Sequence, residues 1–303
     1  MKQRISIICT IVMMVLLVFG CGPKQLETTG ATHQVTDGTG TVVTVPTEPK
    51  HIVPIAASTE DIVLSLVDPS RVAAVGTVPN NVPDASAKVE KHVKASAESM
   101  LSVQPDLVLV PNWMSPDAIG EMRNMQIPVY VYKTPTTVKE AKATIHEIAG
   151  LLHASDESMI ASMDADLKTV EELTNKHSGE RPLVAFYSQF GLTGGKGSTF
   201  DDMCNYLKVN NAAAQIGLGP FDNGTREDLI KSNPDIIFIP SVAYTSDGTT
   251  PATAEQLYSD PALQGVKAIA NRRVYLVDSS QVMSYSQFMT RAMVSMAQNI
   301  YSM

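Results

Sequence analysis

The side chains best placed to bind a ligand follow the ends of predicted strands, and most of them are aromatic, sulfur-containing or uncharged polar residues. They are Ser58, Thr59, Asn112, Trp113, Met114, Tyr187, Gln189, Lys196, Tyr244, Met283 and Tyr285. Such a set favours a large, partly apolar ligand, held by stacking and a few hydrogen bonds, over a small naked ion.

Trp113, the only tryptophan, lies in a predicted loop rather than in a core run. It could cap the sheet edge as packing, but loops past strand ends are where such folds place binding groups, so we favour ligand contact. For Tyr187 and Tyr285, amphipathic packing at a strand end explains the residue equally well.

Lys196 lies in the glycine-rich segment 191–200, GLTGGKGSTF, which differs from a phosphate-binding P-loop. Glycines allow close backbone approach, and the following helix could offer amide donors to an anion. A solvated lysine in a flexible loop is equally consistent. A single lysine without clustered arginines disfavours a strongly anionic ligand, because uncompensated charge in a closed cleft is costly.

The elements that must position these residues are short apolar runs that alternate with helical patterns. The runs are residues 52–56, 72–75, 107–110, 129–132, 183–187, 236–239 and 274–277. They are typical of buried parallel strands, and strands separated by helix-length connections indicate an α/β fold with helices on both sheet faces. Such sheets bind ligands at the carboxyl ends of their strands.

Two successive helices interrupt this alternation, at 138–152 and from Ser155 to about His177. The second would be about 33 Å long at 1.5 Å per residue, enough to join two lobes and permit only limited hinge movement. We therefore expect an N-terminal lobe at 35–153, a connecting helix at 154–180 and a C-terminal lobe at 181–303.

An internal repeat relates the two lobes. Residues 98–109 (ESMLSVQPDLVL) and 227–238 (EDLIKSNPDIIF) each have an acidic residue, Pro-Asp seven positions later, and then a strand. Proline at a strand entrance and glutamate in a helix's first turn each have ordinary local explanations. Neither explains the shared spacing, although a duplicated fold unit would keep it passively.

The chain begins with an export signal. Lys2 and Arg4 precede an apolar stretch from Ile5 to Phe19, and the small residue Gly20 stands before Cys21. Fifteen apolar residues are short for a membrane-spanning helix, which needs about 20. The end of the signal resembles a bacterial lipobox, which would make Cys21 the acylated N-terminus of the mature protein. An ordinary secretory signal at 1–20 with an incidental cysteine is the alternative. Residues 21–34 are polar and predict a tether, and a hairpin should follow from near Val35.

Composition excludes two classes of protein. The 303 residues carry a net charge of −8, which becomes −10 when the two cations of residues 1–20 are removed, and this disfavours a nucleic-acid-binding protein. Three cysteines are too few for a disulfide framework, and Cys204 would remain as a lone thiol.

Five segments in order, spread over nearly the whole mature chain, resemble the substrate-binding lipoproteins of bacterial ABC importers for iron–siderophore complexes, haem and cobalamin. They are DGTGTVVTVPTEPKHIVPIAASTEDIVLSL, AESMLSVQPDLVLV, GGKGSTFDDMCNYL, REDLIKSNPDIIFIP and NRRVYLVD. The chain departs from the family in having His51 where an arginine commonly precedes the strand.

The resemblance implies two Rossmann-like lobes joined by a long helix, a class III periplasmic-binding-protein-like fold. It implies a monomer without catalytic activity or cofactor, held at the outer side of the cell membrane by a lipid on Cys21. One surface glutamate per lobe would engage arginines of the permease, and by motif these are Glu98 and Glu227. Among the family's ligands, a neutral hydroxamate chelate, haem or cobalamin fits the single Lys196 better than a strongly anionic triscatecholate does.

Two alternatives remain. A receptor for zinc or manganese would need imidazole or carboxylate ligands that converge on the cleft, yet the six histidines fall in the tether, in helices or at strand starts. A secreted hydrolase would need an unrecognised site, because neither GxSxG nor HExxH occurs and His146-Glu147 continues with IAG.

Overall fold

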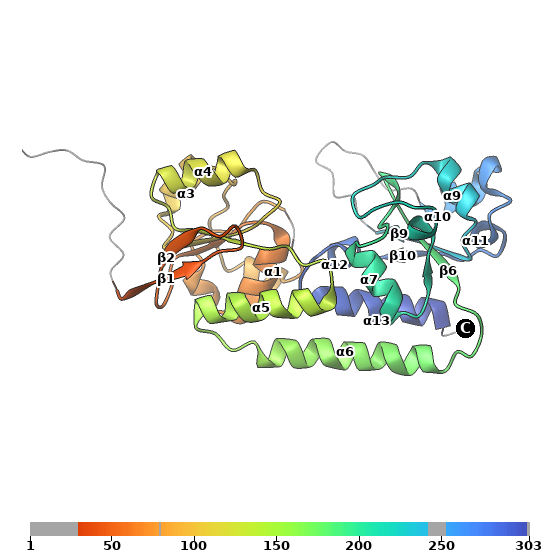
Figure 1. Cartoon of the computed structure of the whole chain (residues 1–303), viewed down its shortest axis with the longest axis horizontal. Coiled ribbons are helices and arrows are strands. Elements are labelled where there is room, and N and C mark those ends of the chain that lie inside the picture. Colours follow the sequence, from red (N-terminus) through yellow and green to blue (C-terminus); the bar gives the residue numbers. More distant parts are fainter. Residues whose placement is uncertain (1–29, 79, 242–252, 302–303) are drawn as a thin grey trace, which may run out of the picture.

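The computed structural model describes residues 30–78, 80–241 and 253–301. The expected signal, Cys21 and the ligand candidate Tyr244 lie outside these residues. The chain forms two α/β lobes side by side, and a long helix runs beneath both (Figure 1). The expected architecture is therefore confirmed.

The N-terminal lobe contains an antiparallel hairpin and a parallel three-stranded sheet in the order β3-β4-β5. Its strands are β1 (Thr32–Thr36), β2 (Val42–Pro46), β3 (Ile52–Pro54), β4 (Leu107–Pro111) and β5 (Val129–Tyr132). Its helices are α1 (Ala57–Leu66), η1 (Pro69–Arg71), α2 (Pro83–Ser86), α3 (Ala97–Val103), α4 (Pro116–Asn124) and α5 (Val138–Leu152).

The C-terminal lobe has a five-stranded sheet in the order β10-β9-β6-β7, with β8 also paired to β6; only β7 runs antiparallel to its neighbour. Its strands are β6 (Leu183–Ser188), β7 (Gly191–Thr193), β8 (Asn210–Asn211), β9 (Ile236–Pro240) and β10 (Val274–Val277). Its helices are α7 (Thr199–Tyr206), α8 (Ala212–Gln215), α9 (Arg226–Ser232), α10 (Ala254–Ser259), η2 (Pro261–Leu263), α11 (Lys267–Ala270), α12 (Ser279–Val282) and α13 (Phe288–Tyr301).

Strands β4, β5 and β9 are buried on both faces, as their continuous apolar runs predict, whereas Leu276 of the edge strand β10 is exposed. In β4, Leu107 and Leu109 point into one apolar cluster and Val108 and Val110 into another. The C-terminal sheet divides its residues in the same way: Phe238 joins the cluster of Leu107, and its neighbours in β9 join a third. One cluster thus receives a face from both sheets.

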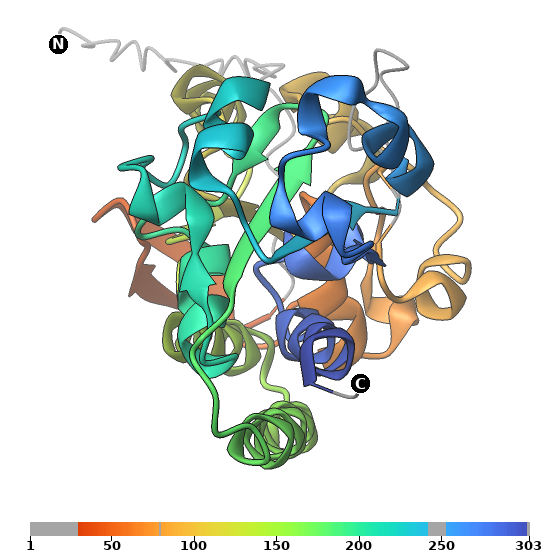
Figure 2. The same ribbon diagram turned by 90° about the vertical axis from the view of Figure 1, so that its right-hand side faces the viewer.

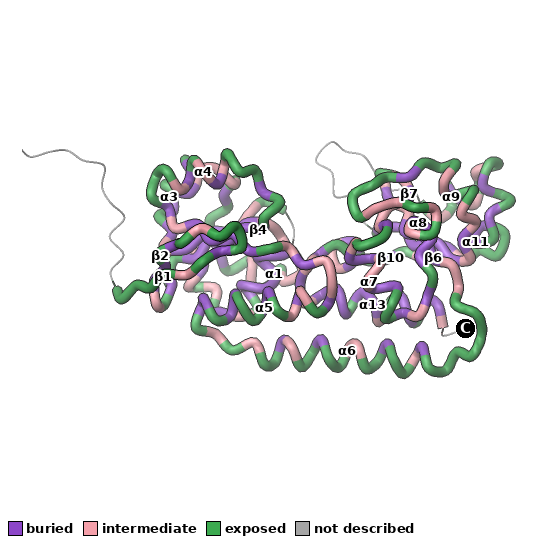
Figure 3. Tube along the Cα trace, in the orientation of Figure 1, coloured by how far each residue is buried: buried purple, intermediate pink, exposed green. Residues whose placement is uncertain are grey.

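Helix α6 (Glu157–Asn175) joins the lobes and begins two residues after the predicted start at Ser155, whose hydroxyl accepts a hydrogen bond from the Glu157 N–H (3.4 Å). Its apolar stripe, which includes Met159, Met163 and Val170, is buried, whereas its opposite side is exposed (Figure 3). Figure 2 shows α6 almost end-on beneath α13, its principal neighbour.

Two stretches differ from the sequence prediction. Residues 72–75 form only isolated bridges, from Val72 to Ile52 and from Val75 to His92, because the next residue, Gly76, donates its N–H to the Glu60 carboxylate (2.8 Å) of α1 instead of continuing a ladder. Order also begins earlier than Val35. Thr32 already pairs with Pro46, since ladder bonds use the backbone and need no apolar side chain.

The hairpin is fastened to the lobe at its turn. The buried Asp37 carboxylate accepts hydrogen bonds from the N–H groups of Thr39 (2.9 Å) and Thr41 (3.0 Å), and it pairs with Arg123 of α4. Burial acts to raise the Asp37 pKa, but these hydrogen bonds outweigh it and lower the pKa. Gly38 donates its N–H to the Val131 carbonyl (2.6 Å), so closely that a Cβ there would meet the Val131 oxygen at 2.9 Å.

The aspartate of each repeat anchors the first strand of its sheet. The Asp106 carboxylate accepts from the N–H groups of Lys50 (2.7 Å) and His51 (2.9 Å), just before β3. The Asp235 carboxylate accepts from the Leu183 N–H (2.8 Å) at the start of β6. In each lobe the aspartate N–H also donates to the same strand start, through the carbonyls of His51 and Leu183. The shared Pro-Asp spacing therefore has a structural role that the sequence did not reveal.

We expect Asp106→Ala to lower the free energy of unfolding by about 1–2 kcal/mol, because two backbone donors lose their acceptor. Asp235→Ala should cost about 1 kcal/mol for one such donor. Denaturant titration followed by circular dichroism measures both. Asp106→Asn keeps one acceptor oxygen and should fall between wild type and Asp106→Ala; a loss equal to that of Asp106→Ala would contradict this anchoring role.

Candidate functional site

Helices α3 and α9 carry the two glutamates of the repeat on matching supports. Each is capped by a hydroxyl, from Ser96 or Thr225, and each ends at a residue in the left-handed conformation, Gln104 (φ 49°) or Asn233 (φ 48°). Glu98 and Glu227 are exposed in the first turns. Both helices lie on the side of the molecule opposite α6, one over each lobe (Figure 1).

The described ligand candidates divide by exposure. Asn112, Trp113, Lys196 and Met283 are exposed, Trp113 to 62%. Tyr187, Gln189 and Tyr285 are half-buried, and burial raises the pKa of both tyrosines. Ser58, Thr59 and Met114 are buried.

Thr59 and Met114 are the candidates with the least exposed surface. The Thr59 hydroxyl donates to the Ile55 carbonyl (2.6 Å) and lies 2.8 Å from the phenolic oxygen of Tyr132, so it holds α1 against β5. Met114 packs in the apolar cluster of the N-terminal lobe. Ser58, the neighbouring residue of α1, is also buried. These side chains maintain the interior rather than offer surface to a ligand.

The loops after β4 and β5 are joined beside Trp113. The Asn112 side-chain oxygen accepts from the Thr134 N–H (3.0 Å), and the Asn112 N–H donates to the Tyr132 carbonyl (3.0 Å). The Thr134 hydroxyl is buried and has no hydrogen-bond partner among the residues that the structure describes. Asn112 therefore shapes this loop pair, and Thr134 adds a polar group that the sequence prediction missed.

Two further exposed aromatic residues lie in the two loops that are bonded together at Lys196 and Leu192. Phe190 lies in the β6–β7 turn, and Phe221, 86% exposed, lies in the loop before α9. Backbone bonds between Leu192 and Gly224 join the two segments, and Lys196 donates its N–H to the Leu218 carbonyl (2.8 Å) of the second loop. In the sequence, each phenylalanine stands among residues typical of loops, such as glycine, proline and asparagine. This pattern could have predicted an exposed aromatic side chain.

Two carboxylates form hydrogen bonds between the lobes. Asp61 of α1 accepts from the Asn81 N–H (2.6 Å) and from the Ser286 hydroxyl (3.2 Å), which belongs to the C-terminal lobe. Burial raises the Asp61 pKa to about 6, against the hydrogen bonds that act to lower it, and Glu60 adds repulsion. Asp202 of α7 accepts from the Val138 N–H (2.8 Å) of α5, and its pKa is also raised by burial.

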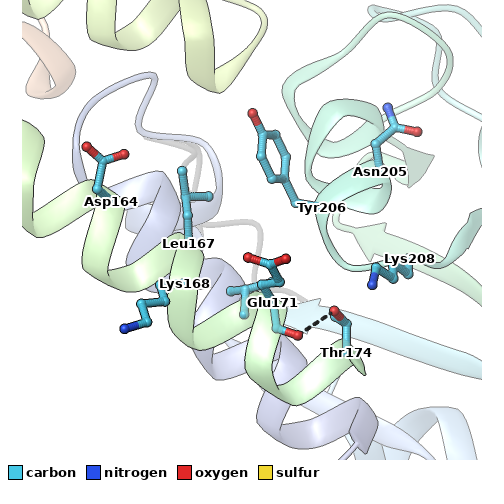
Figure 4. A pocket seen from close by; sticks show the side chains of 9 residues that line it. Asp164, Leu167, Lys168, Glu171, Thr174, Asn205, Tyr206 and Lys208 are labelled. Atoms are coloured by element: carbon cyan, nitrogen blue, oxygen red, sulfur yellow. Dashed lines mark hydrogen bonds between the residues drawn. The ribbon is translucent and has the colours of Figure 1, made fainter. Parts of the chain in front are cut away.

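Three surface hollows lie along α6, away from the strand ends. The one between α6 and the end of α7, of about 460 Å³, has Leu167 and Glu171 on one side and Tyr206 on the other (Figure 4). The others, of about 620 and 180 Å³, adjoin α5 and α13. None of the candidate residues lines these three hollows.

Across the described residues, no three His, Cys, Asp or Glu side chains are grouped in a way that could hold a metal ion. In the same part of the chain, no helix is both long and apolar enough to cross a membrane.

A comparison with family models identifies the fold family. The model for periplasmic binding proteins matches residues 52–281, most of both lobes. This chain belongs to the periplasmic binding protein family. The resemblance drawn from the sequence is thereby confirmed, and the two lobes with their connecting helix have the class III form of the fold.

Similar proteins come from several organisms. An uncharacterized ABC transporter substrate-binding lipoprotein of Bacillus subtilis, YvrC, is 27% identical and aligns over 99% of this chain and 98% of its own length. A cobalamin-binding protein of Halobacterium salinarum is 22% identical over 86% of this chain and 72% of its own. The structure of the periplasmic heme-binding protein RhuT from Roseiflexus superposes with a TM-score of 0.71 at 20% identity, over 84% of this chain and 98% of that one.

The raised pKa of Asp61 predicts a pH dependence of stability. Because folding favours the protonated carboxyl, this group's contribution is fully present only below its ordinary pKa of 3.8 and is lost as the pH rises from there through about 6. Between pH 4 and 8 the wild type should therefore lose on the order of 2 kcal/mol relative to Asp61→Asn, a variant that cannot titrate there. Urea unfolding at a series of pH values measures this difference. A constant difference across the range would contradict the assignment.

Proposed function

We propose that this protein is an extracytoplasmic substrate-binding lipoprotein of an ABC importer, which captures an iron chelate, haem or cobalamin between its lobes and delivers it to the membrane permease. The observation that carries the proposal is the matched placement of Glu98 and Glu227. Both are exposed at equivalent positions of equivalent helices on one side of the molecule (Figure 1).

Two exposed carboxylates, one on each lobe, suit a partner that meets both lobes at once and carries a cation opposite each. Rim charges of this kind govern encounter and orientation more than affinity. A permease with two cationic sites at a fixed spacing fits this pattern, because it would recognise both lobes together and not a single charged surface. The resemblance of the chain to an ABC transporter substrate-binding lipoprotein over nearly its full length supports that partner.

The exposed side chains of the loops support the proposed ligand class. Trp113, Phe190, Phe221 and Met283 offer apolar surface, and Asn112 and Lys196 offer polar contacts. Planar or bulky apolar ligands with few charges suit such a surface. Proteins described as heme-binding and cobalamin-binding are among its relatives.

We place the ligand between the lobes and assign capture, without catalysis, as the role of the chain. We also propose that it acts as a monomer held to the membrane by a lipid on Cys21.

Trp113 should report ligand binding. Its fluorescence is expected to change when the purified protein is titrated with its ligand from a panel of ferric hydroxamates, haem, cobalamin and, as the competing class, Zn²⁺ and Mn²⁺. Trp113→Ala should weaken binding about tenfold, the value of roughly 1.4 kcal/mol of lost aromatic contact. Isothermal titration calorimetry measures both proteins. Tight binding that neither perturbs Trp113 nor depends on it would place this residue outside the site.

Glu98→Ala combined with Glu227→Ala should abolish uptake of the ligand by cells while its affinity for the purified protein stays unchanged, because the permease contact alone is lost. The matched control is Glu121→Ala with Glu255→Ala, which removes one exposed glutamate from each lobe elsewhere. The control should transport normally. Uptake that persists in the first variant, or ligand binding that disappears in it, would overturn the proposed docking role.

A further inference from the structure

The side chain of Asp61 is buried where the two lobes meet and binds donors from both. Within its own lobe it accepts from the N–H of Asn81 (2.6 Å) and from the Asn81 side-chain amide (2.8 Å). From the other lobe it accepts from the Ser286 hydroxyl (3.2 Å), which is itself fully buried. A buried carboxylate is costly unless such donors satisfy it, so these bonds resist separation of the lobes.

Asn81 extends the same contact. Its amide nitrogen donates to the Ser280 carbonyl (3.0 Å), and its amide oxygen accepts from the Ser280 hydroxyl (2.7 Å). Seven residues after Ser280, the side-chain amide of Gln287 donates to the backbone carbonyl of Asp61 (2.9 Å). The chain from α12 to the start of α13 is thus bonded to α1 and its neighbouring loop at several points.

The segment that carries Ser286 is held in an unusual conformation. Tyr285 has a φ of 50°, a left-handed backbone that non-glycine residues adopt rarely. The buried Ser284 on its other side donates its hydroxyl to the Gln281 carbonyl (3.0 Å). Such strain persists only where the surroundings determine the conformation, and here it directs the Ser286 hydroxyl to Asp61.

A second carboxylate crosses between the lobes in the opposite direction. Asp202 of the C-terminal lobe accepts from the Val138 N–H (2.8 Å) of the N-terminal lobe. Val138 is the first residue of α5, and a helix leaves its first N–H groups without partners inside the helix. Asp202 therefore supplies an acceptor that α5 itself lacks.

We propose that Asp61 and Asp202 are positioning residues that together fix the angle between the two lobes. The apolar cluster shared by both lobes holds them together without favouring a direction, and these two directional contacts, made from different helices, select one orientation within that packing. Given the proposed function, that orientation sets the spacing at which Glu98 and Glu227 meet the permease and the width available to the ligand.

Distance measurement between the lobes tests this without ligand or permease, so its failure is separate from failure of the proposed function. Spin labels are attached to cysteines that replace the exposed Ser102 of α3 and Lys231 of α9. The buried Cys204, whose thiol pKa is raised by burial, should stay unlabelled, and the chain without added cysteines verifies this. Pulsed electron double resonance at pH 7.5 then gives the distance distribution.

Asp61→Asn and Ser286→Ala should each broaden the distribution or shift it by about 2 Å, the scale of a genuine domain rearrangement. Adding Asp202→Asn to either should enlarge the change. Ser286→Ala leaves Asp61 and its own lobe intact, so it guards against a local folding defect in the first variant.

The matched control is Asp37→Asn, which alters a buried aspartate whose partners all lie in the N-terminal lobe. This variant should lower the thermal midpoint and leave the distance unchanged. Folded Asp61→Asn and Ser286→Ala proteins with the wild-type distribution, alone and combined with Asp202→Asn, would overturn the proposal.

Discussion

The arrangement of this protein depends on one apolar layer that both sheets share. Each sheet turns one face toward it, with residues such as Leu109 of β4 and Phe238 of β9, and helices α5, α6 and α13 close it from below. Separating the lobes would expose this layer to water at about 25 cal/mol per Å² of apolar surface. The two outer clusters belong to one lobe each, so each lobe keeps its own interior while the shared layer keeps them together.

Buried or partly buried aspartates supply hydrogen-bond acceptors to backbone N–H groups that lack a partner within their own helix or strand. Asp106, Asp235, Asp61 and Asp202 each accept from backbone N–H groups at a strand start, in a loop or at a helix start. Their negative charges are occupied inside the fold, whereas Glu98 and Glu227 project from the surface. The net charge of −8 therefore includes aspartates that serve as hydrogen-bond acceptors within the fold and glutamates that are available to a partner.

Much of the fold could be predicted from the sequence because burial on two faces leaves a direct signature. Strands β4, β5, β6, β9 and β10, and helices α5 and α6, coincide closely with apolar runs or with a helical period. Residues 72–75 have the same composition as a strand but pair only at isolated points, since pairing depends on a partner that the run itself does not specify. The hydrophobic pattern reports burial and says little about which neighbour is bonded.

The candidate site was less predictable for a related reason. A position just past a strand end can point outward, as Trp113 does, or inward, as Met114 does one residue later. Thr59 is buried and hydrogen-bonded to Tyr132, which is 73 residues away in the sequence. No local sequence pattern predicts such a contact. Asp61 and Ser286 are 225 residues apart in the sequence and lie in different lobes, so their contact depends on how the two lobes pack together.

The N-terminal hairpin determines how a mechanical load on the start of the chain would reach the body of the protein. Thr32, the outer end of β1, pairs with Pro46 at the point where the chain continues toward β3. A pull on this end would break the backbone pairs between β1 and β2 one at a time. We expect the separation to stop at the turn, because Asp37 is bonded to Arg123 and Gly38 to Val131. Strand β1 is hydrogen-bonded in its sheet to β2 alone, so the ladder that yields first is separate from the two parallel sheets, and the cost of losing β1 is set by that ladder and by the packing of Val35.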